Sequence, residues 1–422
     1  MGHSDGDIIS RVEVRKNKVT VHRGPCLKGL VRRTLGVEYD AAIDLGELDE
    51  SILITPYVLN VVPALWVLGG TYVVDSMDED LFHSLESVKR GFQTLYPDVP
   101  WQGRLVPRRL VKNPRREGST PPSQVLFYSG GVDSTYSALH CDPNDTVLLT
   151  VQGHDIALDN EDAWRTVCGR ADEFARGLGF TTARVRANVI DLLRPSGTPD
   201  GYPGLKPWYG KVQHGLGLSG LAFPLAAYRG WKNIVFSSFA SPDGEPFQWG
   251  SHLLLEPELV ANGIKVVSIG ESTHWVDKIL AISDMHREHG SKRYRLRVCY
   301  DSTSGDSVEN CCSCEKCLRG IVALLARFKS PDAWGFCVPE PLHETVKKRL
   351  MSVQLPSHNL LHWRRLKEVA VSSLGEADGE SREFLSWFST WDFEKNVSGR
   401  RSQALPRSRR TFQRAFGRLF GP

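Results

Sequence analysis

The chain has 422 residues, of which 41% are hydrophobic and 24% are charged, as is ordinary for a globular protein of two or three domains. Its formal net charge of +3 provides no global positive field for nucleic acid, and no apolar stretch is long enough to span a membrane. Five of the nine cysteines fall between Cys299 and Cys317, and the N-terminus lacks the features of a signal peptide. We therefore expect a cytoplasmic protein that binds a metal and has no disulfide framework.

Residues 1–103 are expected to form an N-terminal α+β domain. Apolar residues alternate between Ile9 and Val21, which predicts a hairpin, and residues 51–74 predict further strands. Residues 78–95 have the apolar spacing of a helix. Residues 104–123 are basic and rich in proline and offer too little apolar surface for a core, so they predict a linker.

Residues 124–330 change to strands that alternate with helices, which predicts an α/β domain with a parallel sheet covered on both faces. The predicted strands are 124–128, 147–151, 182–189, 233–238 and 266–269, and the predicted helices are 134–140, 160–178, 216–228 and 273–285. Ligands of such sheets bind beyond the carboxyl ends of the strands.

Residues 331–422 predict a helical C-terminal extension, with helices at 360–374 and 383–393. The extension ends in a basic tail with seven arginines from Arg400 to Arg418 and no acidic residue. Because phenylalanines lie among these arginines, one interpretation is an amphipathic helix that docks on another molecule. An acidic partner is favoured over nucleic acid as that molecule. A merely solvated basic end is the other interpretation.

One six-residue motif lies between the first predicted strand and helix of the α/β domain, and consists of Ser129, Gly130, Gly131, Val132, Asp133 and Ser134. The two glycines let backbone N–H groups approach an oxyanion, and the following helix adds the positive end of its dipole. The serines add hydroxyl donors, and the aspartate could cap the helix or help to hold Mg2+. The motif therefore predicts a phosphate site, with a serine-rich turn of no functional weight as the alternative.

This motif resembles the signature of the PP-loop ATP pyrophosphatases. Those enzymes cleave ATP to AMP and pyrophosphate and thereby activate a substrate oxygen as an adenylate. The resemblance implies that the six residues bind ATP together with Mg2+, on a PP-loop core of the adenine nucleotide alpha hydrolase kind.

A cysteine cluster follows near the end of the same region. Cys311, Cys314 and Cys317 are separated by two residues each, and Cys299 lies a short loop upstream. Four thiolates complete a tetrahedral Zn2+ site, which we expect to be structural, and Cys312 is expected to remain free. An iron–sulfur cluster is the alternative, because the same spacing occurs in ferredoxin-type sequences.

Together, the motif and the cluster resemble the 7-cyano-7-deazaguanine synthases over about half of the chain, near residues 124–326. These enzymes adenylate the carboxylate of 7-carboxy-7-deazaguanine, let ammonia form the amide, and use a second ATP to make the nitrile; their zinc is structural. The chain departs from the family at Cys312, where glycine is usual, and in the substrate loop before residue 260. The ATP chemistry is therefore expected to carry over more fully than the substrate handling.

Long synthase-like proteins of this kind occur in bacterial anti-phage operons of the CBASS and Qat types, and the chain resembles that group most. The resemblance implies that a deazaguanine acyl group is joined to the N-terminal amine of a partner protein from the same operon. The alternatives are a 7-cyano-7-deazaguanine synthase that uses ammonia, a tRNA-modifying PP-loop enzyme, and a nucleotide-binding subunit without turnover.

Further candidates supply a cation, a base and a substrate pocket. Lys278 is the candidate cation beside the leaving pyrophosphate, and His154 or His214 is the candidate base for the attacking amine. Solvated or merely structural side chains are the alternative for each of them. The substrate-binding candidates are Phe247, Trp249, His252 and Lys211, and the arginines expected to offset the charge of the cysteine cluster are Arg297 and Arg319.

Overall fold

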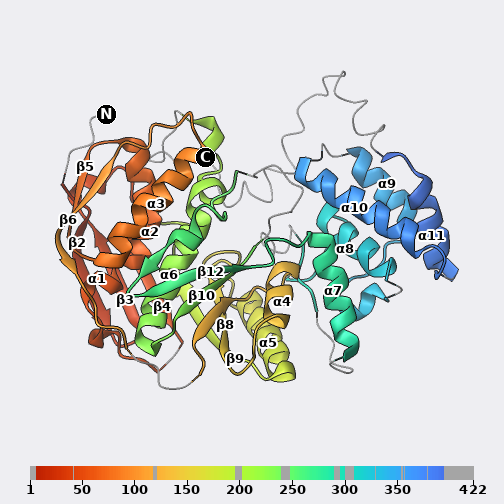
Figure 1. Cartoon of the computed structure of the whole chain (residues 1–422), viewed down its shortest axis with the longest axis horizontal. Coiled ribbons are helices and arrows are strands. Elements are labelled where there is room, and N and C mark those ends of the chain that lie inside the picture. Colours follow the sequence, from red (N-terminus) through yellow and green to blue (C-terminus); the bar gives the residue numbers. More distant parts are fainter. Residues whose placement is uncertain are drawn as a thin grey trace.

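The computed structural model describes residues 6–40, 42–116, 121–194, 202–238, 248–288, 295–299, 308–327, 329–352, 355, 357–377 and 379–393. Over these residues the protein is a mixed α/β structure with two sheets. The N-terminal elements gather at one end of the molecule and helices α7–α11 at the other, with the central strands between them (Figure 1).

The larger sheet has nine strands in the order β11-β12-β10-β7-β8-β9-β4-β3-β2. Its centre consists of five parallel strands, which are β12 (Ile264–Ile269), β10 (Asn233–Ser237), β7 (Gln124–Phe127), β8 (Thr146–Gln152) and β9 (Thr181–Ala187). The parallel sheet predicted for residues 124–330 is therefore confirmed. Antiparallel strands extend it at both ends, namely β11 (Val260–Ala261) at one and β4 (Leu35–Tyr39), β3 (Lys18–Arg23) and β2 (Ile9–Arg15) at the other.

The central strands are buried on both faces, because successive side chains of a strand point to opposite sides of the sheet. Val125 and Ile234 belong to one core, whereas their neighbours Leu126 and Val235 belong to the other. The first core lies under α6 (His214–Arg229). The second lies under helices that include α4 (Val132–Leu139), α7 (Trp275–Glu288) and α8 (Glu315–Leu325). Helix α5 (Glu161–Leu178) packs on β8 and β9.

The direction in which successive parallel strands are added across the sheet reverses at β7. The chain passes outward from β7 to β8 and β9, and then returns to β10 on the other side of β7 before it continues to β12. Ligands of open α/β sheets bind at such a reversal, outside the carboxyl ends of the strands. Ser129 follows β7 and Ser238 follows β10, so the six-residue motif lies at this position.

The N-terminal region confirms two predictions and overturns most of a third. The predicted hairpin is formed by β2 and β3, and the predicted helix at residues 78–95 is α3 (Glu79–Leu95). Residues 51–74 were predicted as strands, but they first form α1 (Glu50–Leu53) and α2 (Thr55–Leu68), and only the end of this range, from Thr71, is a strand, as part of β5 (Thr71–Asp78). Helix α2 is buried all round against α6, so its apolar residues show no helical periodicity and its valines imitate a strand.

The predicted linker at residues 104–123 is also partly wrong. Residues 104–111 form β6 (Arg104–Val111), which pairs in parallel with β5 in a smaller sheet that also contains β1 (Gly6–Asp7). Its basic side chains are largely exposed on this edge strand, so a low apolar content did not prevent pairing. The larger sheet also runs across the expected domain boundaries, because β2–β4 come from the first 40 residues.

The C-terminal region is helical, as predicted. Helix α10 (Ser357–Ser373) and helix α11 (Gly379–Thr390) correspond to the predicted helices, while α9 (Leu342–Ser352), and α8 in the preceding region, were not predicted. The buried rings of Trp363 and Phe388 join these helices to the second core. The basic tail from Arg400 to Arg418 lies outside the described residues. Within the described part of the chain, no helix combines the length and the hydrophobicity that crossing a bilayer requires.

Candidate functional site

The glycine motif forms a sharp corner between β7 and α4. Gly130 has a φ of +73°, and a Cβ atom at this position would meet no other atom within 4 Å, so the backbone is open on that side. The hydroxyl of Ser134 lies 3.2 Å from the Ser129 hydroxyl and 3.2 Å from the Gly131 carbonyl oxygen, and therefore fixes the shape of the corner. No side chain of the described residues caps the first turn of α4. Its N–H groups are thus available to an anion.

Lys278 lies behind this corner and joins three elements. Its ammonium group, on α7, donates to Asp133 Oδ1 at 2.8 Å and to the carbonyl oxygen of Ser238 at the end of β10. The lysine side chain is only 1% exposed, whereas that of Asp133 is 25% exposed. Gly270, with a φ of +86°, makes room for it, because a Cβ atom there would lie 3.0 Å from Lys278 Cε. The structure therefore brings the two candidate catalytic residues Asp133 and Lys278 together at the reversal point of the sheet.

The two candidate histidines also meet in space. His154 follows β8 and His214 begins α6, and their ring centroids are 4.9 Å apart. Tyr209, from the π-helical turn before α6, lies 5.0 Å from His154 and 5.7 Å from His214. Burial lowers the pKa of His214 to about 3 and raises that of Tyr209 well above its usual value. Both groups are therefore neutral near pH 7.

Asp155 links the histidines to the glycine motif. Its Oδ1 lies 2.8 Å from His154 Nδ1, and its Oδ2 accepts a hydrogen bond from Arg297 Nη2 at 3.3 Å. Desolvation raises the pKa of Asp155, but the interactions with His154 and then with Arg297 outweigh it and hold the pKa below its usual range. Asp155 is therefore a carboxylate at neutral pH.

Arg297 was expected to offset the charge of the cysteine cluster, but it contacts the glycine motif. Its backbone N–H donates to the Gly130 carbonyl oxygen at 2.8 Å and its Nε donates to the Ser129 carbonyl oxygen at 3.2 Å. The other flanking arginine, Arg319, pairs with Glu315 on α8 and lies over the ring of Trp275. Sequence reasoning thus missed Arg297, Asp155 and Tyr209 as site residues. The sequence held one signal for Arg297: it lies two residues before Cys299, and a metal bound by Cys299 would fix its position.

The candidate substrate residues are only partly brought together. Trp249 packs on Gly210 and its ring lies 5.9 Å from that of His214, so it borders the histidine pair. Lys211 donates to the Gln248 carbonyl oxygen at 2.8 Å, and burial lowers its pKa. The Nδ1 of His252 accepts from the N–H of Leu254 at 3.1 Å, which is a local turn contact, and burial lowers the pKa of this imidazole. Phe247 lies outside the described residues.

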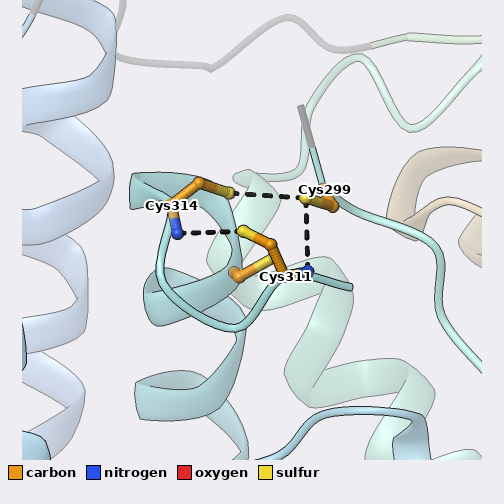
Figure 2. A group of neighbouring side chains, drawn as sticks. Cys299, Cys311 and Cys314 are labelled. Carbon is orange, nitrogen blue, oxygen red and sulfur yellow. Dashed lines mark hydrogen bonds between the residues drawn. The ribbon is translucent and has the colours of Figure 1, made fainter. Parts of the chain in front are cut away.

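The four predicted metal ligands converge. The sulfur atoms of Cys299, Cys311, Cys314 and Cys317 all lie within 4.8 Å of one another. Cys299 approaches from one segment, while Cys311 and Cys314 come from the turn that leads into α8 (Figure 2). Backbone N–H groups point at two of the sulfurs, at 3.4 Å for Cys299 and 3.2 Å for Cys311. Such a set of sulfur atoms could hold a metal such as zinc.

Neighbouring residues shape this cluster without joining it. Cys312 has a φ of +55°, and its sulfur contacts the Asn310 carbonyl oxygen and the N–H of Cys337, so it stays outside the cluster as predicted. The side chain of Asn310 accepts from the N–H groups of Val298 and Cys299 and donates to the Leu296 carbonyl oxygen. It therefore holds the segment 295–299 against the turn that carries the other cysteines.

No protein-family model, no curated protein and no solved structure matches the chain. The geometry of the site and the sequence motifs are therefore the basis for a functional proposal.

Proposed function

We propose that the chain is an ATP-dependent ligase that forms AMP and pyrophosphate and activates a carboxylate as an acyl adenylate at residues 129–134. The observation that carries the proposal is the position of an uncapped, glycine-rich corner at the sheet reversal, with the buried Lys278 beside it. The α4 amides and the motif hydroxyls would bind the phosphates. Lys278 would offset the charge that develops on the leaving pyrophosphate.

Asp133 has a second role in this proposal. Its side chain is partly exposed even while it accepts from Lys278, so it can offer an oxygen atom to Mg2+. The ion would neutralise phosphate charge. The four cysteines would hold a structural Zn2+, whose effect is to fix the segment from Arg297 to Cys299 against the glycine motif.

The proposed acid is a 7-deazaguanine carboxylate, and the proposed acceptor is an amine, the N-terminus of a partner protein encoded in the same anti-phage operon. Both rest on the resemblance of the motif and the cysteine spacing to the deazaguanine synthases. Trp249 and the adjoining histidines, which offer ring faces and polar edges, are compatible with a planar heterocycle.

The test is to incubate the protein with ATP, Mg2+ and 7-carboxy-7-deazaguanine and to measure AMP and pyrophosphate. We expect acid-dependent formation of both products, and a loss of on the order of tenfold or more in Ser129→Ala because a donor to the phosphates is removed. Ser10→Ala, at an exposed serine of β2, is the matched control. Formation of ADP and phosphate, or turnover without dependence on the acid, would contradict the proposal.

Mass spectrometry of the same reaction identifies the acceptor. A deazaguanine acyl group on a protein encoded beside this chain supports the conjugating ligase. Conversion of the small molecule to its amide or nitrile when ammonia is supplied, with every protein unmodified, assigns the 7-cyano-7-deazaguanine synthase reaction instead.

A further inference from the structure

The two candidate histidines, which are both partly exposed, differ in their partners. The Nδ1 of His154 lies 2.8 Å from Asp155 Oδ1, and its Nε2 is buried and has no hydrogen-bond partner among the described residues. A carboxylate accepts the Nδ1 proton, so the lone pair of the neutral ring lies on Nε2. This nitrogen is free to take a proton from another molecule.

His214 is less suited to that role. Its Nδ1 is also buried and unpartnered within the described chain, but burial and the neighbouring His154 ring hold its pKa near 3. An imidazole that resists protonation this strongly is a poor base near pH 7. It remains suitable as a ring wall or as a neutral hydrogen-bonding group.

We propose that His154 is the general base for the nucleophile that attacks the adenylate, that Asp155 is its positioning residue, and that Arg297 joins this pair to the nucleotide loop. The proposal rests on the adenylation function proposed above. It distinguishes between two histidines that the sequence left equivalent, and it adds Asp155 and Arg297 to the site.

The step is a transfer of an acyl group from AMP to an amine. The amine nitrogen forms a bond to the acyl carbon, the bond from that carbon to the AMP phosphate oxygen breaks, and AMP leaves with the electron pair. The proton released by the amine passes to His154 Nε2. The products are the amide, AMP and an imidazolium ion that Asp155 stabilises.

The position of His154 is compatible with this step. His154 follows β8, Ser129 follows β7, and these neighbouring parallel strands end at the same edge of the sheet. Arg297 contacts Ser129 of the motif through its Nε and Asp155 through its Nη2. Asp155 in turn contacts His154. The arginine side chain is 8% exposed, whereas the Asp155 side chain is 41% exposed, so only the arginine end of the connection is shielded from water.

Asp155, His214 and Tyr209 lie against His154, and Arg297 lies behind Asp155. Asp155, from the loop after β8, lies 2.8 Å from the ring nitrogen, and Arg297, from the segment 295–299, donates to the other oxygen of Asp155. His214 on α6 and Tyr209 before it remain neutral near pH 7, so they contribute dipoles and no charge. Removal of the Asp155 carboxylate would therefore leave His154 Nδ1 without its acceptor and let the ring proton move to Nε2, where it blocks the transfer of a proton from the amine.

The test separates adenylation from transfer. Wild type, His154→Gln, Asp155→Asn and His214→Gln would be assayed with ATP, Mg2+ and 7-carboxy-7-deazaguanine for acid-dependent exchange of pyrophosphate into ATP. The same proteins would then receive either ammonium chloride or hydroxylamine, with the amide and the hydroxamate measured. Ammonium must lose a proton to react, whereas hydroxylamine is largely unprotonated at neutral pH. His140→Gln, at an exposed histidine that ends α4, is the control.

We expect His154→Gln to keep pyrophosphate exchange and hydroxamate formation while amide formation falls by about 100-fold or more. Asp155→Asn should also keep pyrophosphate exchange, lower amide formation by on the order of tenfold or more, and be rescued by hydroxylamine. Equal loss of exchange and amide formation in His154→Gln, or a larger selective loss in His214→Gln, would overturn the assignment. Wild type without acid-dependent exchange would instead refute the adenylation function itself.

Discussion

The buried contact between Lys278 and Asp133 gives a prediction that depends on the structure alone. Lys278→Met keeps most of the aliphatic volume but removes the ammonium group that donates to Asp133 and to the Ser238 carbonyl oxygen. Loss of one partner of a fully buried ion pair costs about 3–5 kcal/mol. Asp133 is 25% exposed, so water replaces part of its contact and the expected loss is smaller. We predict that the free energy of unfolding falls by about 2–3 kcal/mol.

Urea denaturation of the wild type and the variant measures this loss, with Lys265→Met, at an exposed lysine of β12, as the control. A double-mutant cycle with Asp133→Asn should give a coupling energy of about 1 kcal/mol or more, because the two groups touch. Additive losses, or a Lys278→Met variant as stable as Lys265→Met, would refute the buried contact.

Three further predictions concern backbone, metal and pH. Gly153→Ala should destabilise the protein by about 2 kcal/mol or more in the same urea assay, because φ is +90° at this position and the new Cβ would lie 1.7 Å from the Ala187 carbonyl oxygen. The control is Gly169→Ala on the open surface of α5, which should be neutral or stabilising. Cys317→Ser should lose the bound zinc in elemental analysis while Cys168→Ser keeps it, and equal metal content in both would contradict the proposed ligand set. Burial raises the pKa of Glu256 from 4.5 to about 7, so the folded state holds this proton more tightly than the unfolded chain. The free energy of unfolding should therefore fall as pH rises between these values, by up to about 3 kcal/mol, and Glu256→Gln should remove that dependence; identical pH profiles would argue against it.

The central sheet could be predicted because its signals are local. Short runs rich in valine, isoleucine and leucine alternate with amphipathic helices, and each strand is bounded by polar or glycine residues. Helix α2 could not be predicted in this way, because Val58, Val61 and Val62 are buried on all sides and their burial depends on α6, far along the chain. Strand β6 was missed for the opposite reason, since pairing with β5 rather than apolar content holds it in place.

The same division applies to the site. The glycine motif and the cysteine cluster are each short in sequence, so residue type and spacing identified both. The network of Arg297, Asp155 and His154 comes from two segments more than a hundred residues apart, and only the fold places Arg297 beside the motif. Phe247 was predicted from its place in a polar loop, and it lies outside the described residues.

The measurement that tests the central claim most directly is the transfer of an oxygen atom from the acid to AMP. The protein would be incubated with ATP, Mg2+, an amine and 7-carboxy-7-deazaguanine whose carboxylate carries heavy oxygen, and the AMP would be analysed by mass spectrometry. The account predicts AMP with one heavy oxygen, because the acyl adenylate breaks at the acyl carbon and leaves the bridging oxygen on phosphate. Unlabelled AMP, or label found only in free phosphate, would contradict it.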